Sequence, residues 1–177
     1  MKLSIVMMVK DESKHLEDVL KSINPISEQI DYEIIVLDTG SSDNTVEIAK
    51  KYTDKVFFKK WNNNFSSMRN KSISYATGEW VFILDGDEVL SNQESLIAFF
   101  ESGKDKEVNS AFVKLKNITN EFDGSFNVAI LRRIFRNDDD FRYIGSIHEQ
   151  PNYKDPHIFL DLTLIHYGYL ATDSELI

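Results

Sequence analysis

Apolar runs alternate with segments of helical spacing along the first half of this chain, and this alternation constrains the fold more than any other feature. Four of the runs are typical of strands buried on both faces, at residues 3–9, 32–37, 55–59 and 80–84. The segments between them, 15–23, 44–52 and 66–76, favour helices. Because strand and helix alternate in this order, we predict an α/β fold with an open, mainly parallel sheet and helices on both faces.

The second half has a different pattern. After a helix near residues 93–102, the segments 111–118, 126–135, 141–147 and 158–165 are rich in β-branched and aromatic residues, which favours strands. No repeat or linker separates the two halves. We therefore predict one domain over 1–177, in which a nucleotide-binding half (1–90) continues into a mixed, partly antiparallel half (91–177).

Composition excludes some classes of protein. The 177 residues are 42% hydrophobic, which is enough for a core, and 20 basic against 29 acidic side chains give a net charge of -9. This balance argues against nucleic acid as the partner, because binding its phosphates needs clustered cations. The absence of cysteine excludes disulfides and thiolate metal sites. No apolar segment is long enough for a signal peptide or a transmembrane helix, so we expect a cytoplasmic protein, free or peripheral at the inner face of the membrane.

Polar clusters follow three of the predicted strands, at the carboxyl ends where open α/β sheets bind ligands. The clusters are Lys10-Asp11-Glu12, Asp38-Thr39-Gly40-Ser41 and Asp85-Gly86-Asp87-Glu88. Asp38 is placed to accept a hydrogen bond from a base or ribose, and its alternative role is to cap the following helix. The convergence of the three clusters predicts a ligand site at this edge.

Asp85-Gly86-Asp87 is the most informative cluster. A glycine between two carboxylates lets the backbone approach a ligand while the oxygens face one cation, and Mg²⁺ or Mn²⁺ prefers such ligands. The cation would stabilise charge on a departing diphosphate. The alternative is an acidic β-turn, but the position at the end of a buried strand favours the metal site.

Ordered motifs lie at residues 9–12, 33–45, 65–70, 76–80 and 84–88, and together they resemble glycosyltransferase family 2, which has the GT-A fold. Residues 131–137, 145–149 and 166–169 resemble a bacterial subgroup whose domain often precedes helical repeats. The resemblance spans nearly the whole chain. Relatives commonly have asparagine in place of Asp11, which puts a side-chain contact there in question. Many relatives also continue into further helices, so we expect either a truncated C-terminus or a minimal domain.

The resemblance implies a metal-dependent, inverting transferase that moves a sugar from a nucleotide-diphosphate donor, a UDP-sugar by expectation, to a hydroxyl. The implied acceptors are cell-envelope glycans, lipid-linked sugars or protein. The nucleotide-sugar contacts would come from Met8, Val9, Glu12, Asp38, Arg69, Asp85 and Gly86. Asp85 and Asp87 would bind Mn²⁺ or Mg²⁺, and Glu149 would be the catalytic base.

Several alternatives stay open. His166 is a candidate third metal ligand that would favour manganese, or else a strand-end histidine packed among Tyr167 and Tyr169. One arginine of Arg132, Arg133 and Arg136 can neutralise phosphate, although a solvated strand face is the default. A nucleotidyltransferase is disfavoured because residues 9–15 contain no glycine. A non-catalytic module that binds a nucleotide sugar or a glycan remains the alternative function.

Overall fold

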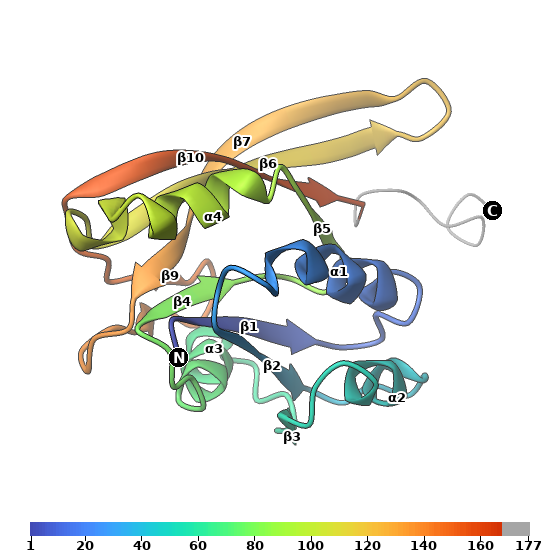
Figure 1. The fold of residues 1–177 in the computed structure, drawn as a ribbon. Coiled ribbons are helices and arrows are strands. Elements are labelled where there is room, and N and C mark those ends of the chain that lie inside the picture. The colour runs from blue at the N-terminus through green and yellow to red at the C-terminus, as the bar shows by residue number, and fades with distance from the viewer. Residues whose placement is uncertain (168–177) are drawn as a thin grey trace.

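An eight-stranded sheet forms the centre of the molecule in the computed structural model, which describes residues 1–167 (Figure 1). Its strand order is β3-β2-β1-β4-β7-β6-β10-β5, and β8 and β9 form a separate ribbon. The strands are β1 (Leu3–Val9), β2 (Tyr32–Asp38), β3 (Val56–Phe58), β4 (Trp80–Ile83), β5 (Glu88–Ser91), β6 (Ser110–Asn120), β7 (Ser125–Arg136), β8 (Tyr143–Ile144), β9 (Gln150–Pro151) and β10 (His157–His166). The helices are α1 (Leu16–Ile23), α2 (Thr45–Lys50), α3 (Phe65–Ile73) and α4 (Glu94–Glu101), with short 3-10 turns at Asn24–Ile26 and Lys104–Lys106.

The first half is parallel, as predicted. β1 lies between β2 and β4 and pairs with both in parallel, and β2 pairs in parallel with β3. In this register Val9 is opposite Asp38, and Asp38 is opposite Phe58. The polar segments that follow β1 and β2 therefore start at the same edge of the sheet.

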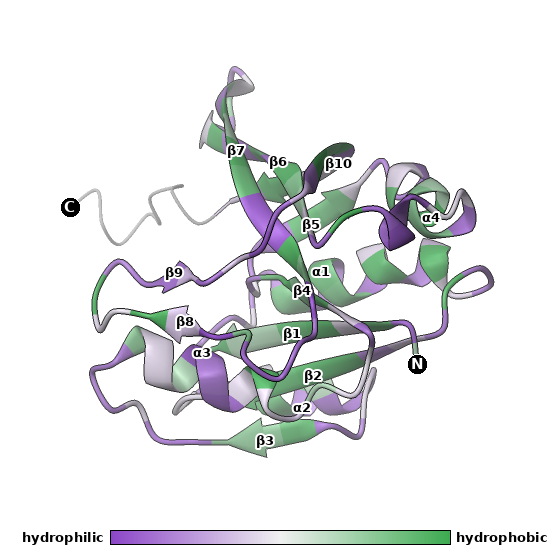
Figure 2. Cartoon of the chain, turned by 90° about the vertical axis from the view of Figure 1, so that its left-hand side faces the viewer, coloured by the Kyte–Doolittle hydropathy of each residue, from purple (hydrophilic) through white to green (hydrophobic). Residues whose placement is uncertain are grey.

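Helices cover both faces of this sheet, which confirms the predicted fold class. On one face, α1 and α4 contribute Leu20 and Phe99 to a core that also contains Ile5 of β1. On the other face, Ile73 of α3 packs with Val6 in a second, smaller core. Neighbouring residues of β1 serve opposite faces because side chains alternate along a strand, so β1 is hydrophobic along its length (Figure 2).

The second half is mixed, also as predicted. β7 runs antiparallel to β4 and β6, while β10 is parallel to β6 and antiparallel to β5. β4 pairs only with the last three residues of β7, Ile134–Arg136, whereas β6 pairs along most of that strand. The β6–β7 hairpin consequently extends beyond the first half of the sheet (Figure 1).

The prediction of a strand at residues 141–147 is wrong. Only Tyr143–Ile144 is extended and paired, and its partner is Gln150–Pro151 in the separate ribbon. The side chain of Asn70 on α3 binds the backbone N–H of Tyr143 at 2.7 Å and its C=O at 3.0 Å, and Gly145 has φ 101. The segment therefore binds to a helix and turns, and does not enter the main sheet.

β5 was not expected either, because it begins at Glu88, directly after the acidic turn.

None of the helices in residues 1–167 is long and apolar enough to cross a membrane.

Candidate functional site

The loops that follow β1 and β2 are tied together by hydrogen bonds. The Asp11 N–H donates to Ser41 Oγ at 2.9 Å, and Asp11 Oδ1 accepts from the Ser42 N–H at 2.7 Å. The Glu12 N–H donates to Thr45 Oγ1 at 2.9 Å. Asp11 has φ 51, a conformation that aspartate adopts more readily than most residues. The side chain of Asp11 thus shapes the loop that carries Glu12.

Asp38 is buried and binds its own turn. Its carboxylate accepts hydrogen bonds from the N–H of Gly40 at 3.2 Å and from Ser41 Oγ at 2.5 Å. It does not cap α2, whose N-cap residue is Asn44. Thr39 donates to the Val9 carbonyl from both its N–H and its hydroxyl, so Val9 and Asp38 lie side by side at this edge. The contacts predicted for Met8, Val9 and Asp38 with a nucleotide stay predictions.

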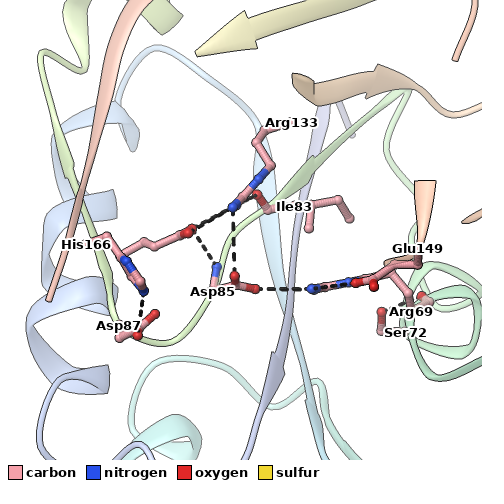
Figure 3. Close-up of polar contacts among 9 residues, drawn as sticks. Arg69, Ser72, Ile83, Asp85, Asp87, Arg133, Glu149 and His166 are labelled. Carbon is pink, nitrogen blue, oxygen red and sulfur yellow. Dashed lines mark hydrogen bonds and ion pairs between the residues drawn. The ribbon is translucent and has the colours of Figure 1, made fainter. Parts of the chain in front are cut away.

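Asp85, which follows β4, lies between two arginines (Figure 3). Its carboxylate is 3.4 Å from both terminal nitrogens of Arg69 on α3 and 3.8 Å from Arg133 on β7. Burial alone would raise the pKa of Asp85, but the two guanidinium groups outweigh that effect and lower it. The carboxylate is therefore held ionised at the point where the two halves of the sheet meet.

Arg133 and Glu88 form a buried bidentate ion pair at the same place. The two N···O distances are 2.8 and 2.9 Å, and Arg133 also donates to the Ile83 carbonyl at 3.2 Å. Glu88 accepts the N–H of Asp85 at 3.0 Å. Burial would lower the pKa of Arg133, but the charges of Glu88 and Asp85 raise it. The expectation of a solvated strand face is wrong for Arg133, and Glu88 was missed as a partner although it lies within the polar cluster of residues 85–88.

Asp87 points to a different partner. Its Oδ2 is 2.9 Å from His166 Nε2, and the other ring nitrogen of His166 is 2.9 Å from Asn117 Oδ1. The hydrogen bond with Asp87 raises the pKa of His166. The alternative was that His166 packs among Tyr167 and Tyr169. The ring of Tyr167 instead stacks on His15, with ring centroids 5.7 Å apart, and Tyr169 lies outside the described residues.

Gly86 is required by the close approach of the loop after β1. A Cβ at this position would be 3.0 Å from Glu12 Cγ and 3.1 Å from Val9 Cγ1, so a larger residue would displace both. Glu12 lies close to Asp85 and Asp87. Burial, and then the charges of Asp87 and Asp85, raise the pKa of Glu12 to about 7. Gly86 therefore allows the first and third clusters to form one site.

The arrangement suits a divalent cation only in part. Within residues 1–167, no three His, Asp or Glu side chains converge as a complete metal cage. Asp85 and Asp87 have different partners, so the expectation that both face one cation stays a prediction. The Asp87–His166 pair does supply one carboxylate oxygen and one imidazole nitrogen, and Asn117 fixes the orientation of the ring through its other nitrogen. These two donors would suit Mn²⁺, which accepts both oxygen and imidazole ligands.

A cleft of about 450 Å³ opens beside Asp85. Arg69, Asp85, Arg133, Tyr143 and Glu149 all line it. Glu149 Oε1 is 3.8 Å from Arg69 Nη2, so Arg69 lies between the two carboxylates.

Helix α3 also fixes the loop that carries Glu149. Ser66 Oγ donates to the Gly145 carbonyl, and the Phe65 N–H donates to the Ser146 carbonyl at 3.1 Å. The same helix thus positions Arg69 and the candidate base.

The chain belongs to glycosyl transferase family 2, since the profile of this family matches residues 4–169. It is 32% identical over 175 residues to the SPbeta prophage-derived glycosyltransferase SunS of Bacillus subtilis, which covers 96% of this chain and 40% of SunS. It is 38% identical over 148 residues to a TPR repeat-containing protein of Synechococcus elongatus, covering 82% of this chain and 34% of that protein. The chain thus spans two fifths or less of the length of these relatives.

Among solved structures, Staphylococcus aureus TarS has a similar fold. The TM-score is 0.68 at 18% identity, and the match covers 94% of this chain and 36% of TarS. This likeness supports the GT-A architecture.

Proposed function

We propose that this chain is the donor-binding and catalytic part of a metal-dependent, inverting glycosyltransferase that uses a nucleotide-diphosphate sugar. The observation that carries the proposal is the side-by-side placement of the Asp87–His166 pair and the cleft with Asp85, Arg69 and Glu149. Crystal structures of a TarS fragment with UDP and with UDP-GlcNAc, which resemble this chain with a TM-score of 0.55, support UDP as the nucleotide.

Donor binding would be the task of residues 1–90. The loops at Met8, Val9, Glu12 and Asp38 would receive the base and ribose, with the backbone of Gly86 close to the diphosphate. Asp87 and His166 would hold Mn²⁺ or Mg²⁺, with Asp85 as a further predicted ligand. The bound metal would neutralise charge on the leaving diphosphate.

Transfer would use residues of the second half, 91–177. The Glu149 carboxylate takes the proton of the acceptor hydroxyl, whose oxygen attacks the anomeric carbon from the side opposite the diphosphate. The carbon–oxygen bond to the diphosphate breaks, and the configuration inverts. Arg69 contacts both Asp85 and Glu149, so it orients the carboxylates on the donor and acceptor sides.

The acceptor would be a cell-envelope glycan, a lipid-linked sugar or a protein. The names of the relatives indicate different acceptors. One relative is a poly(ribitol-phosphate) β-N-acetylglucosaminyltransferase of S. aureus, 33% identical over 110 residues. Another is a cholesterol galactosyltransferase of Borreliella burgdorferi, 35% identical over 92 residues.

Calorimetric titration of UDP with and without Mn²⁺ tests the donor half of the proposal. Asp87→Asn and His166→Gln are expected to weaken metal-dependent binding by about 100-fold or more, since each removes a ligand that bridges the metal to the protein. Asp139→Asn, at an exposed turn, is the matched control. Binding that never requires a divalent metal, or equal affinity in all variants, would refute the metal assignment.

Turnover of UDP-sugars tests the catalytic half. Glu149→Gln is expected to lower turnover about 10²–10⁴-fold while UDP affinity is unchanged, because the base acts on the acceptor and not on the nucleotide. If the wild-type chain binds UDP-sugars but never transfers or hydrolyses them, the non-catalytic module is the correct function.

A further inference from the structure

The cleft beside Asp85 runs along the edge of strand β7. Four consecutive residues of that strand, Ile130–Arg133, line it. Arg133 lies at an irregularity in the pairing with β6, but Ile130–Arg132 alternate regularly. Because consecutive side chains of a strand point to opposite faces, one cleft can touch these three in a row only from the edge, where the main chain is accessible. Glu149 and Gln150 line the same cleft.

This edge has no strand partner in the part of the chain that the structure describes. β6 pairs along one side of β7 through Phe126–Phe135. On the other side, β4 reaches only Ile134–Arg136. The stretch before Ile134 therefore presents alternating N–H and C=O groups that need partners.

The side chains beside the edge are unusually apolar for an exposed strand. Phe126 and Val128 are each 52% exposed and Ile130 is 47% exposed, all on the same face of β7. The solvated face of an antiparallel sheet is ordinarily polar. Lys114 and Lys116 of β6 are opposite Ile130 and Val128. Lys114 pairs with Asp161 at 3.0 Å, so Lys116 supplies the positive charge beside the apolar row.

We propose that the acceptor is an extended polypeptide that adds to the edge of β7 as a further strand and presents a hydroxyl side chain to Glu149. This inference rests on the proposed transferase function and names its acceptor class. A peptide strand offers one N–H and one C=O on the same side at about every 7 Å, which matches the free edge. A glycan has hydroxyls without that alternation. Apolar side chains of the peptide would cover Val128 and Ile130, and an acidic one would meet Lys116.

Binding of a fluorescein-labelled peptide tests the proposal by anisotropy, with UDP and Mn²⁺ present. The probe is a 12-residue peptide of alternating threonine and valine with two glutamates at each end. Two further versions carry N-methyl groups at every second residue of the central segment, one at the odd positions and one at the even positions. Strand addition predicts that one version loses at least tenfold in affinity while the other binds like the parent, because only one set of N–H groups faces β7.

Protein variants give an independent readout. Val128→Lys is expected to weaken peptide binding about fivefold through lost apolar contact, and Phe122→Lys, at the more exposed hairpin turn, is the control that introduces the same charge away from the cleft. UDP binding is expected to be unchanged in both, so a failure of the peptide proposal can be distinguished from a failure of the donor site. Two results would overturn the inference: equal affinity for both N-methylated versions, or sugar transfer to glycan acceptors such as maltoheptaose without any transfer to the peptide. Dimerisation that Val128→Lys abolishes, seen by sedimentation, would assign the edge to a second copy of the chain and would overturn it as well.

Discussion

Replacing Arg133 with methionine is the perturbation that most directly tests how the site is built. Arg133 is the only cation that contacts both Glu88 and Asp85 within the described residues. Methionine keeps most of the volume and removes the charge. Glu88, whose side chain is 2% exposed, would then lose its bidentate partner and keep only the N–H of Asp85.

The expected cost follows from burial. Removing one partner of a buried, hydrogen-bonded ion pair costs about 3–5 kcal/mol, because the other charge remains desolvated. The upper part of this range applies since Arg133 also leaves the Ile83 carbonyl without its hydrogen bond. For a domain of this size each kcal/mol lowers the melting temperature by roughly 2–4 °C, so a cost of about 4–5 kcal/mol is expected to lower it by roughly 8–20 °C.

Urea unfolding of four proteins measures the coupling: wild type, Arg133→Met, Glu88→Leu and the double variant. The double variant is expected to be at least about 2 kcal/mol more stable than Arg133→Met, because an apolar pair replaces an uncompensated charge. If the effects of the two single substitutions add up to that of the double variant, or if Arg133→Met costs less than about 1 kcal/mol, then water reaches the ion pair and the pair does not organise the site.

Three further outcomes are expected. Gly86→Ala weakens UDP binding and destabilises the fold by about 1–3 kcal/mol, because its Cβ would meet Glu12 and Val9; calorimetry and urea unfolding measure both effects. Gly78→Ala lowers the free energy of unfolding by at least about 1–3 kcal/mol, because its Cβ would lie 2.7 Å from the backbone nitrogen of Ser4. Unchanged stability would refute this reasoning. Burial alone would raise the pKa of Glu33, but hydrogen bonds from Lys55, Ser4 and Thr77 outweigh it and lower the pKa to about 2 from 4.5. The stabilisation from Glu33 is therefore present above pH 4.5 and is lost as the pH falls towards 2. Unfolding across this range is expected to show a weaker pH dependence of stability in Glu33→Gln than in wild type, because other carboxylates such as Asp43 have lowered pKa values in both proteins.

Much of the fold was predictable because its determinants are local. The apolar runs of β1 and β2 are buried on both faces, and their periodicity and length identify them without knowledge of their neighbours. Their polar carboxyl ends then meet at one edge as a consequence of parallel pairing. The loops after β1 and β2 were predicted to converge for this reason, and the hydrogen bonds of Asp11 with Ser41 and Ser42 confirm it.

The partners of the acidic side chains were not predictable in the same way. Asp87 is bound by His166, 79 residues later, and Glu88 by Arg133, 45 residues later. Such pairings depend on strand order, and the order β4-β7-β6-β10-β5 is not encoded in any local pattern. The side chain of Asn70 similarly decides that Tyr143 binds a helix, which no β-propensity reveals.

The net charge of the whole chain does not predict the charge of its site, because the fold decides which charged side chains come together. A net charge of -9 describes the surface as a sum, whereas a ligand in the cleft meets only the nearest groups. The cleft is lined by three arginines, Arg69, Arg132 and Arg133, against the carboxylates Asp85 and Glu149. Glu88 pairs with Arg133 and Asp155 with Arg132, so the cleft is close to neutral in an acidic protein, and a divalent cation bound at Asp87 and His166 would make it more positive. We therefore expect binding of an anionic diphosphate to depend on that cation together with the nearby guanidinium groups, while the acidic exterior weakens binding of polyanions elsewhere.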